Sequence, residues 1–223
     1  MQGFSIRMPR VYRLEEYSPE LKDVSLIVGE GLCSNIYVIG REEVTIVDAG
    51  VGNRANPIFP QLSELRVQPA NIKQVVLTHA HHDHVMGIYL ILEKASPKVY
   101  VHEKDSEYIA SSLGDLLVKV KGGDSIETSI GSFSVYWTPG HTGGSMCLYN
   151  LEHKILISGD TVFPDGYYGR YDGESGNLKA IIESLRKLTE LDCEIMLPGH
   201  GSPVFQNAIG HIKLSYSQAS RPK

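Results

Sequence analysis

The feature that most constrains this chain is a cluster of four histidines and one aspartate between residues 78 and 84. It follows a short apolar run, residues 73–77, which is typical of a buried β-strand. Side chains two apart in an extended chain point the same way, so His79 and His81 face one side. Asp83 and His84 then fall at the start of the next predicted helix. The pattern HxHxDH has a chance expectation of under roughly one in a thousand, so we interpret it as a ligand cluster.

Three further candidates share one setting, a glycine-containing turn directly after a predicted strand. They are His141 in Pro-Gly-His-Thr, Asp160 in Ser-Gly-Asp-Thr and His200 in Pro-Gly-His-Gly. Loops at strand ends gather at one edge of a sheet, where distant residues can converge. Together with the cluster they make five histidines and two aspartates, enough for two adjacent metals that share a carboxylate. Neutral imidazoles with few carboxylates suit Zn²⁺ best, with iron or Mn²⁺ as alternatives, rather than Ca²⁺ or Mg²⁺.

Groups of short apolar or alternating runs are separated by stretches with helical spacing. The apolar and alternating runs predict strands over residues 24–28, 35–39, 44–47, 73–77, 98–101, 125–130, 133–137, 146–149, 155–157 and 194–197. The stretches with helical spacing predict helices over residues 56–67, 85–92, 104–112, 178–191 and 205–216. The class is therefore mixed α/β (α+β), with at least one largely antiparallel sheet. We expect one domain over residues 1–223.

Charge and composition exclude several classes of protein. The net charge is −5, and no cluster of Lys and Arg is present, which argues against a nucleic-acid-binding protein. No run of 18 apolar residues occurs, and no basic, apolar leader precedes Val11, so we expect a cytoplasmic protein without a membrane partner. Three widely spaced cysteines, Cys33, Cys147 and Cys193, are typical of a reduced compartment and of inert, buried thiols.

These motifs resemble the metallo-β-lactamase superfamily, from Asp48-Ala-Gly to Pro198-Gly-His200-Gly. The resemblance implies a four-layer αβ/βα sandwich with the metals at one edge. It implies that Asp48 supports a ligand through an outer hydrogen bond. It also implies a ligand set of two groups and a bridge: His79, His81 and His141 for the first metal, Asp83, His84 and His200 for the second, and Asp160 for both.

A second stretch is similar to glyoxalase II-like thioester hydrolases: Gly169-Arg170-Tyr171-Asp172 and the predicted helix that follows. Those enzymes carry a further C-terminal helical domain that binds glutathione, whereas only 23 residues follow His200 here, so we do not expect glutathione as substrate. Tyr167, Tyr168 and Arg170 are candidates for binding an anionic substrate group. The alternative is a loop packed by its own aromatic rings and braced by an Arg170–Asp172 pair.

The first functional hypothesis is a metal-dependent hydrolase in which a metal-bridged hydroxide attacks a thioester, lactone or phosphodiester. Asp83 would hold the proton of this hydroxide. The second is a mononuclear-iron persulfide dioxygenase with His79, His141 and Asp160 as a facial triad. The third is a non-catalytic metal-binding protein. We expect a small-molecule substrate, and a homodimer is compatible with the sequence. His82, on the other side of an extended loop, should face away from the metals.

Overall fold

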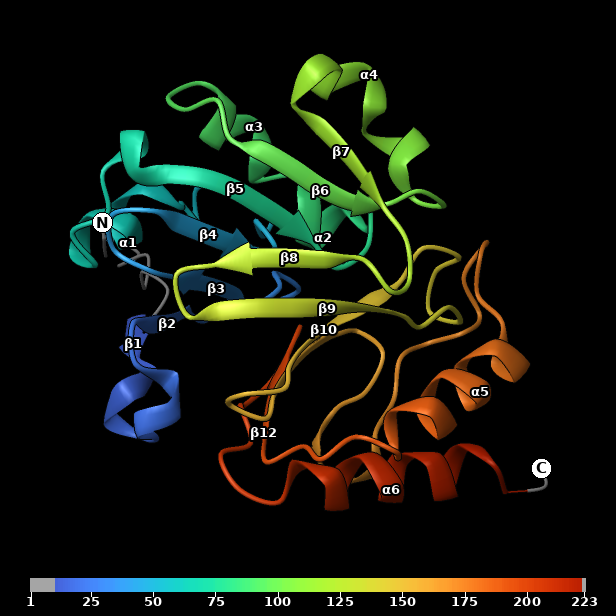
Figure 1. The fold of residues 1–223 in the computed structure, drawn as a ribbon. Helices are drawn as coiled ribbons and strands as arrows, with labels where there is room; N and C mark the ends of the chain where they lie inside the picture. Colours follow the sequence, from blue (N-terminus) through green and yellow to red (C-terminus); the bar gives the residue numbers. More distant parts are fainter. Residues whose placement is uncertain (1–10, 222–223) are drawn as a thin grey trace, which may run out of the picture.

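The computed structural model describes residues 11–221, and two facing β-sheets form its centre (Figure 1). In the larger sheet, seven strands follow one another in sequence order. They are β1 (Val11–Arg13), β2 (Val24–Ile27), β3 (Ile36–Ile39), β4 (Val44–Val47), β5 (Ile72–Leu77), β6 (Lys98–His102) and β7 (Leu117–Val120). Strands β1 to β4 pair antiparallel and β4 to β7 pair parallel. Strand β4 is wholly buried, and β5 is apolar and buried except at Lys73 and Gln74, as expected for strands covered on both faces.

The second sheet has the strand order β12-β11-β10-β9-β8 within the same described residues. Its strands are β8 (Ser125–Thr128), β9 (Gly131–Trp137), β10 (Met146–Asn150), β11 (Ile155–Gly159) and β12 (Ile195–Pro198). All pairs are antiparallel except β11 and β12, which run parallel. The prediction of a mixed fold with one largely antiparallel sheet is therefore confirmed.

The central core lies between the sheets. Leu26, Ile39 and Val76 from the larger sheet pack in one buried cluster with Phe133 and Leu148 from the smaller sheet. Alternation explains why β9 contributes Phe133: its burial switches along the strand, so every second side chain turns to the core.

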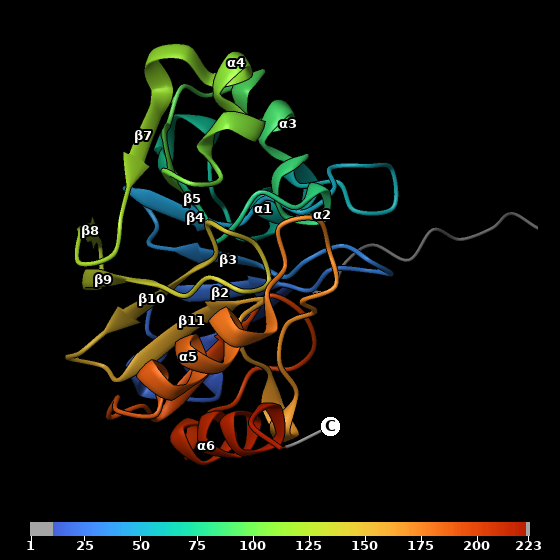
Figure 2. The ribbon, with the colours of Figure 1, turned by 90° about the vertical axis from the view of Figure 1, so that its right-hand side faces the viewer.

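Helices cover the outer face of each sheet, which completes the four layers (Figures 1 and 2). Residues of α1 (Phe59–Glu64), α3 (Ile88–Leu92) and α4 (Ala110–Leu113) pack on the larger sheet. Residues of α5 (Leu178–Leu188) and α6 (Ala208–Ala219) pack on the smaller sheet. Helix α5 is amphipathic, and Asn177 caps its N-terminus with a side chain that accepts a hydrogen bond from the Ala180 amide at 2.9 Å. The predicted αβ/βα sandwich is confirmed.

Three predicted helices are shorter or broken. Of the helix predicted over 56–67, only α1 forms. Pro60 stands in the first turn of α1, and Arg66, with a left-handed φ of 64°, lies just beyond its end. The helix predicted over 85–92 is split into α2 (His82–Val85) and α3. Gly87 stands at the break, and a Cβ there would lie 1.8 Å from the Ala49 carbonyl oxygen. The helix predicted over 104–112 becomes the 3₁₀ turn Ser106–Tyr108 followed by α4.

The remaining differences concern element ends and short strands. Helix α5 ends at Leu188 rather than residue 191, and α6 covers 208–219 rather than 205–216 because Asn207, with a left-handed φ of 53°, precedes it. The three-residue strand β1 and the strand β7 were not predicted. All three cysteines are buried and free, as expected.

The region before Val11, on which the expectation about a leader rests, lies outside the described residues, as do residues 222–223. Over residues 11–221, no helix combines the length and the apolar character that crossing a membrane requires.

Candidate metal centre

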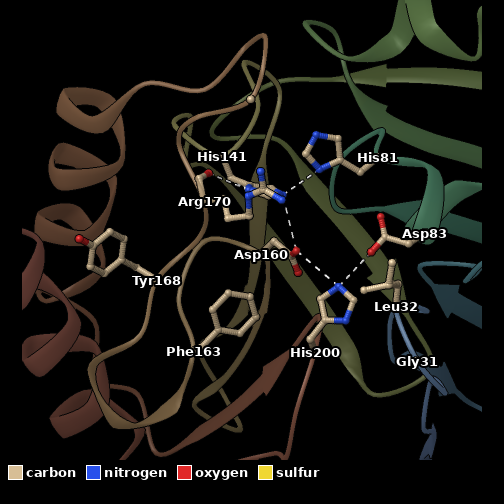
Figure 3. A pocket seen from close by; sticks show the side chains of 11 residues that line it. Gly31, Leu32, His81, Asp83, His141, Asp160, Phe163, Tyr168, Arg170 and His200 are labelled. Carbon is tan, nitrogen blue, oxygen red and sulfur yellow. Dashed lines mark hydrogen bonds and ion pairs between the residues drawn. The ribbon is translucent and has the colours of Figure 1, made fainter.

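The candidate ligands lie in the segments that follow four strands, at one edge of the sandwich, and two of them, Asp83 and His84, belong to helix α2. His79 follows β5, His141 follows β9, Asp160 follows β11 and His200 follows β12. Strand β5 belongs to the larger sheet and the other three strands to the smaller sheet, so the two sheets meet at the site. The expected convergence of strand-end loops is therefore observed (Figure 3).

A first group of three imidazoles contains His79, His81 and His141. His81 Nδ1 lies 3.1 Å from His79 Nε2 and 2.8 Å from His141 Nε2. His81 has extended backbone angles before α2, which lets it point the same way as His79, as its position two residues later predicts. Three nitrogens with such spacing can face one cation.

A second group contains Asp83, His84 and His200. His200 Nε2 lies 3.1 Å from Asp83 Oδ2 and 3.3 Å from His84 Nε2. Asp83 and His84 both belong to the single turn of α2, which confirms the prediction that they open a helix. His82, in the same turn, is exposed and belongs to neither group. His82 faces away from the candidate ligands, as predicted. It lies in helix α2, however, whereas an extended loop was predicted here.

Asp160 lies between the two groups. Its Oδ2 is 3.5 Å from both His141 Nε2 and His200 Nε2, and its Oδ1 is 3.4 Å from His84 Nε2. Oδ1 is buried and accepts no hydrogen bond from the described residues. A buried carboxylate oxygen without a donor is costly, and a cation at this point would satisfy it. The donor set therefore fits two cations with Asp160 between them.

Glycine at position 199 makes this approach of Asp160 possible. A Cβ there would lie 2.2 Å from Asp160 Oδ1 and 2.8 Å from His84 Cε1, closer than such atoms can come. The glycine in Pro-Gly-His-Gly is thus required by the packing of two candidate ligands and not only by the turn.

Protonation follows from burial and from the mixed charges of the cluster. Burial lowers the pKa of His79 well below its usual value, and neighbouring imidazoles lower it further, which keeps this ring neutral as a ligand must be. Burial raises the pKa of Asp83, but a hydrogen bond from His200 and the nearby His84 bring it down to about 2. Burial likewise raises the pKa of Asp160, yet His84 and His200 lower it overall. Both carboxylates are therefore ionised at neutral pH.

Outer hydrogen bonds orient two of the rings. Asp48 Oδ2 lies 2.8 Å from His84 Nδ1, and the Asp48 carboxylate accepts hydrogen bonds from the Thr78 amide and hydroxyl. The Arg170 carbonyl accepts from His141 Nδ1 at 2.9 Å. In both rings Nδ1 is engaged, which leaves Nε2 facing the centre. The expected supporting role of Asp48 matches this geometry.

One supporting residue was missed by sequence reasoning. Asp105 is 1% exposed and accepts hydrogen bonds from the Ala80 amide at 3.0 Å, the Thr142 hydroxyl at 2.8 Å and the Gly144 amide at 2.7 Å. Its carboxylate thus ties the loop of His79 and His81 to the loop of His141. A Cβ at Gly144 would lie 2.5 Å from Asp105 Oδ1. The available signal was an acidic residue just after a buried parallel strand, β6.

A cavity of about 480 Å³ opens onto the ligands, and His81, Asp83, His141, Asp160 and His200 line its floor. Of the three expected substrate-binding residues, Tyr168 and Arg170 line this cavity, whereas Tyr167 is 70% exposed and lies outside its lining. Tyr168 turns its hydroxyl away from the ligands (Figure 3).

The guanidinium of Arg170 is directed to an acid of its own loop. Its Nε and Nη2 donate to the two carboxylate oxygens of Asp172, at 3.0 and 3.3 Å. Tyr168 and Tyr171 stack with ring centroids 6.4 Å apart. These contacts match the alternative that the loop braces itself, and the Arg170 carbonyl, not its side chain, contacts a candidate ligand.

Comparison with known proteins identifies the family. Residues 29–200 match the model of the metallo-beta-lactamase superfamily. The chain is 30% identical over 190 residues to the probable metallo-hydrolase YqgX of Bacillus subtilis (strain 168), covering 78% of this chain and 87% of the relative. It is 32% identical over 130 residues to the hydroxyacylglutathione hydrolase of Francisella tularensis subsp. novicida (strain U112), which covers 58% of this chain and 49% of the relative. The chain thus matches about half the length of that enzyme.

Solved structures agree on the fold. The BLEG-1 B3 metallo-beta-lactamase superposes with a TM-score of 0.70 at 26% identity, covering 88% of this chain and 98% of that one. TTHA1623 in a di-iron-bound form superposes with a TM-score of 0.68 at 25% identity, covering 83% of this chain and 94% of that one. The chain therefore belongs to the metallo-beta-lactamase superfamily.

Proposed function

We propose that this protein is a dinuclear metallohydrolase that cleaves a thioester. The observation that carries the proposal is the position of Asp160, whose carboxylate lies between two groups of ligand atoms and retains one buried oxygen without a hydrogen bond. A site for one cation would need only one of these groups.

Zinc is the proposed metal, with iron or manganese as alternatives. His79, His81 and His141 would hold one ion, Asp83, His84 and His200 the other, and Asp160 would contact both. The set is rich in imidazole nitrogens, which suit zinc, and iron is compatible with it because TTHA1623 holds two irons in the same fold. When bound, two such ions polarise a carbonyl oxygen and lower the pKa of a water molecule towards neutrality.

The residues of the chain orient the reactants. Asp83 lines the cavity, and its pKa of about 2 makes it an acceptor of hydrogen bonds at neutral pH, so it can hold the attacking water by one proton. Asp48 and the Arg170 carbonyl fix the rings of His84 and His141 from behind. Asp105 keeps the two histidine loops in register. These contacts hold the site in one arrangement before substrate binds.

The choice of a thioester rests on the hydroxyacylglutathione hydrolases among the relatives, which match over about half their length. Lactones and phosphodiesters are the alternatives, since the same centre can polarise a carbonyl or a phosphoryl oxygen. We further propose that the substrate is a small molecule, because the ligands lie at the floor of a cavity of about 480 Å³.

Elemental analysis together with a substrate panel tests the proposal. The purified protein should hold close to two metal ions per chain and should hydrolyse a thioester faster than a lactone or a phosphodiester of similar size. One tightly held iron with O₂ consumption on a persulfide would instead establish the dioxygenase alternative. A protein that holds no metal would contradict both.

A further inference from the structure

A second cavity, of about 650 Å³, adjoins the candidate metal centre. Gly31 and His200 line both cavities, so the second one begins beside a candidate ligand. It extends from there towards the N-terminal elements, the 3₁₀ turn Leu14–Glu16 and strand β2, and to the residues after β12. Neither the proposed metal ions nor the residues that hold them account for this space.

Seven of the fifteen described residues that line the second cavity have aromatic or aliphatic side chains. They are Tyr12, Leu14, Tyr17, Leu26, Val28, Pro203 and Phe205. Tyr17 and Phe205 stack face to face with ring centroids 5.0 Å apart. Such walls gain free energy by removing apolar surface from water, and cavities of this size and composition are typical of small-molecule sites.

The charges of the two cavities disfavour an anionic ligand in the second one. Among the described residues that line it, Glu30 is the only one of the types Asp, Glu, Lys and Arg. The first cavity contains one arginine or lysine in its described lining, Arg170, and its guanidinium is already paired with Asp172. An anionic chain such as glutathione would therefore find no unpaired Lys or Arg side chain among the described residues that line the two cavities.

The walls are attached rigidly to the candidate ligands. Asn35 Nδ2 donates to the Pro198 and Gly201 carbonyls, at 3.0 and 2.9 Å, and the Asn35 amide donates to the Gly199 carbonyl at 2.7 Å. The loop after β2 is thus fixed to both sides of His200. A ligand group in the second cavity would keep a constant position relative to the metal centre.

Leu32 provides an independent observation. It stands in the loop between the cavities, beside Asp83 and His200 (Figure 3), and its side chain is 86% exposed. An apolar side chain so exposed at the junction of the metal site and the second cavity is suited to cover an apolar ligand that passes between them.

We propose that the second cavity binds the apolar acyl chain of the substrate while the thioester carbonyl lies at the metal centre. This inference rests on the proposed hydrolase function and narrows it. The substrate class becomes thioesters with acyl chains well longer than acetyl, in place of small hydroxyacyl groups.

Chain-length selectivity is the first test. Thioesters of N-acetylcysteamine with acetyl, butyryl, hexanoyl and octanoyl groups share one neutral leaving group, so only the acyl chain varies. We expect kcat/KM to rise about 10-fold or more from acetyl to octanoyl. Val28→Trp fills the cavity and should reduce this ratio to near one. Ser111→Trp, an exposed position in α4, is the matched control and should keep the ratio of the unchanged protein.

Binding of alcohols to the metal-loaded protein is the second test, because alcohols contain no hydrolysable bond. Calorimetry with 1-butanol, 1-hexanol and 1-octanol should show Kd falling by about threefold to fourfold per added methylene. Val28→Trp should abolish binding of 1-octanol. If that variant does not fold, Tyr17→Ala, which removes an exposed part of the wall, should weaken the binding of 1-octanol severalfold.

The two tests separate the inference from the function on which it rests. Hydrolysis without preference for chain length, together with no binding of 1-octanol, would overturn the acyl-chain site and leave the hydrolase intact. Faster cleavage of a polar hydroxyacyl thioester than of the octanoyl one would also overturn it. Failure to cleave any thioester would overturn the proposed function, and the calorimetry would still decide whether the cavity binds an apolar chain.

Discussion

Replacement of Asp105 by asparagine should loosen the candidate metal centre without touching a ligand. The carboxylate Oδ1 accepts from the Gly144 amide, and Oδ2 accepts from the Ala80 amide and the Thr142 hydroxyl. An asparagine side chain has one oxygen and one NH₂ group in these two places. Whichever way the amide turns, at least one buried backbone N–H then faces another donor.

The magnitude follows from these contacts. A hydrogen bond to a charged group contributes about 1.5–3 kcal/mol, and a buried donor left without an acceptor costs a similar amount. The Thr142 hydroxyl can rotate to accept a hydrogen bond from the new NH₂ group. Only one backbone amide is then left without an acceptor. We therefore expect Asp105→Asn to lower the free energy of unfolding by about 2–3 kcal/mol.

Metal affinity distinguishes a positioning role from general destabilisation. Asp105 connects the loops of His79, His81 and His141, whereas Asp83, His84 and His200 receive no bond from it. Chelator titration should release one ion from the variant at 10–100-fold lower chelator concentration, with the other ion retained, because outer-contact residues have effects of about this size.

Urea denaturation and chelator titration should be run beside Asp115→Asn, a control at an exposed aspartate. Equal weakening of both ions would show that Asp105 does not act on one group of ligands. A free energy of unfolding for Asp105→Asn within about 0.5 kcal/mol of that of the unchanged protein would refute the hydrogen-bond reasoning itself.

Three further predictions concern other parts of the molecule. Asp160→Ala should lose metal and lower kcat/KM about 100-fold or more, because this carboxylate lies between both groups of ligands. The kcat/KM of His82→Ala, at an exposed position, should stay within about twofold of the unchanged protein, and an equal fall of kcat/KM in both variants would refute the assigned geometry. Arg170→Lys should change KM alike for anionic and neutral substrates, since this guanidinium pairs with its own loop, and a KM effect confined to anionic substrates would contradict the brace. Burial raises the pKa of Cys147 to about 11 and of Cys193 to about 12, so both thiols should react slowly with a disulfide reagent until urea unfolds the chain. Because these folded-state pKa values exceed the unfolded ones, the unfolded chain loses protons first, and urea melts should show stability falling as pH rises above about 9.

The sequence by itself determined the candidate ligands and the kind of element that presents them. Alternation and apolar runs are local properties, so ten of the twelve described strands, all but β1 and β7, could be predicted within a residue or two. The spacing of His79 and His81 decides their common direction because an extended chain repeats every two residues. The helix break at Gly87 could not be predicted, since it accompanies a close approach to the distant Ala49 backbone.

Only the tertiary structure decided how the ligands are shared and supported. The place of Asp160 between two groups depends on the packing of the two sheets, and Gly199 is required because two candidate ligands approach it. The brace by Asp105 joins residues 25 and 39 positions away in sequence, and the Asn35 side chain bonds residues 163 and 166 positions away. Such contacts leave no local pattern, because a side chain's partner across the sandwich is set by strand pairing and layer packing and not by its neighbours in the chain.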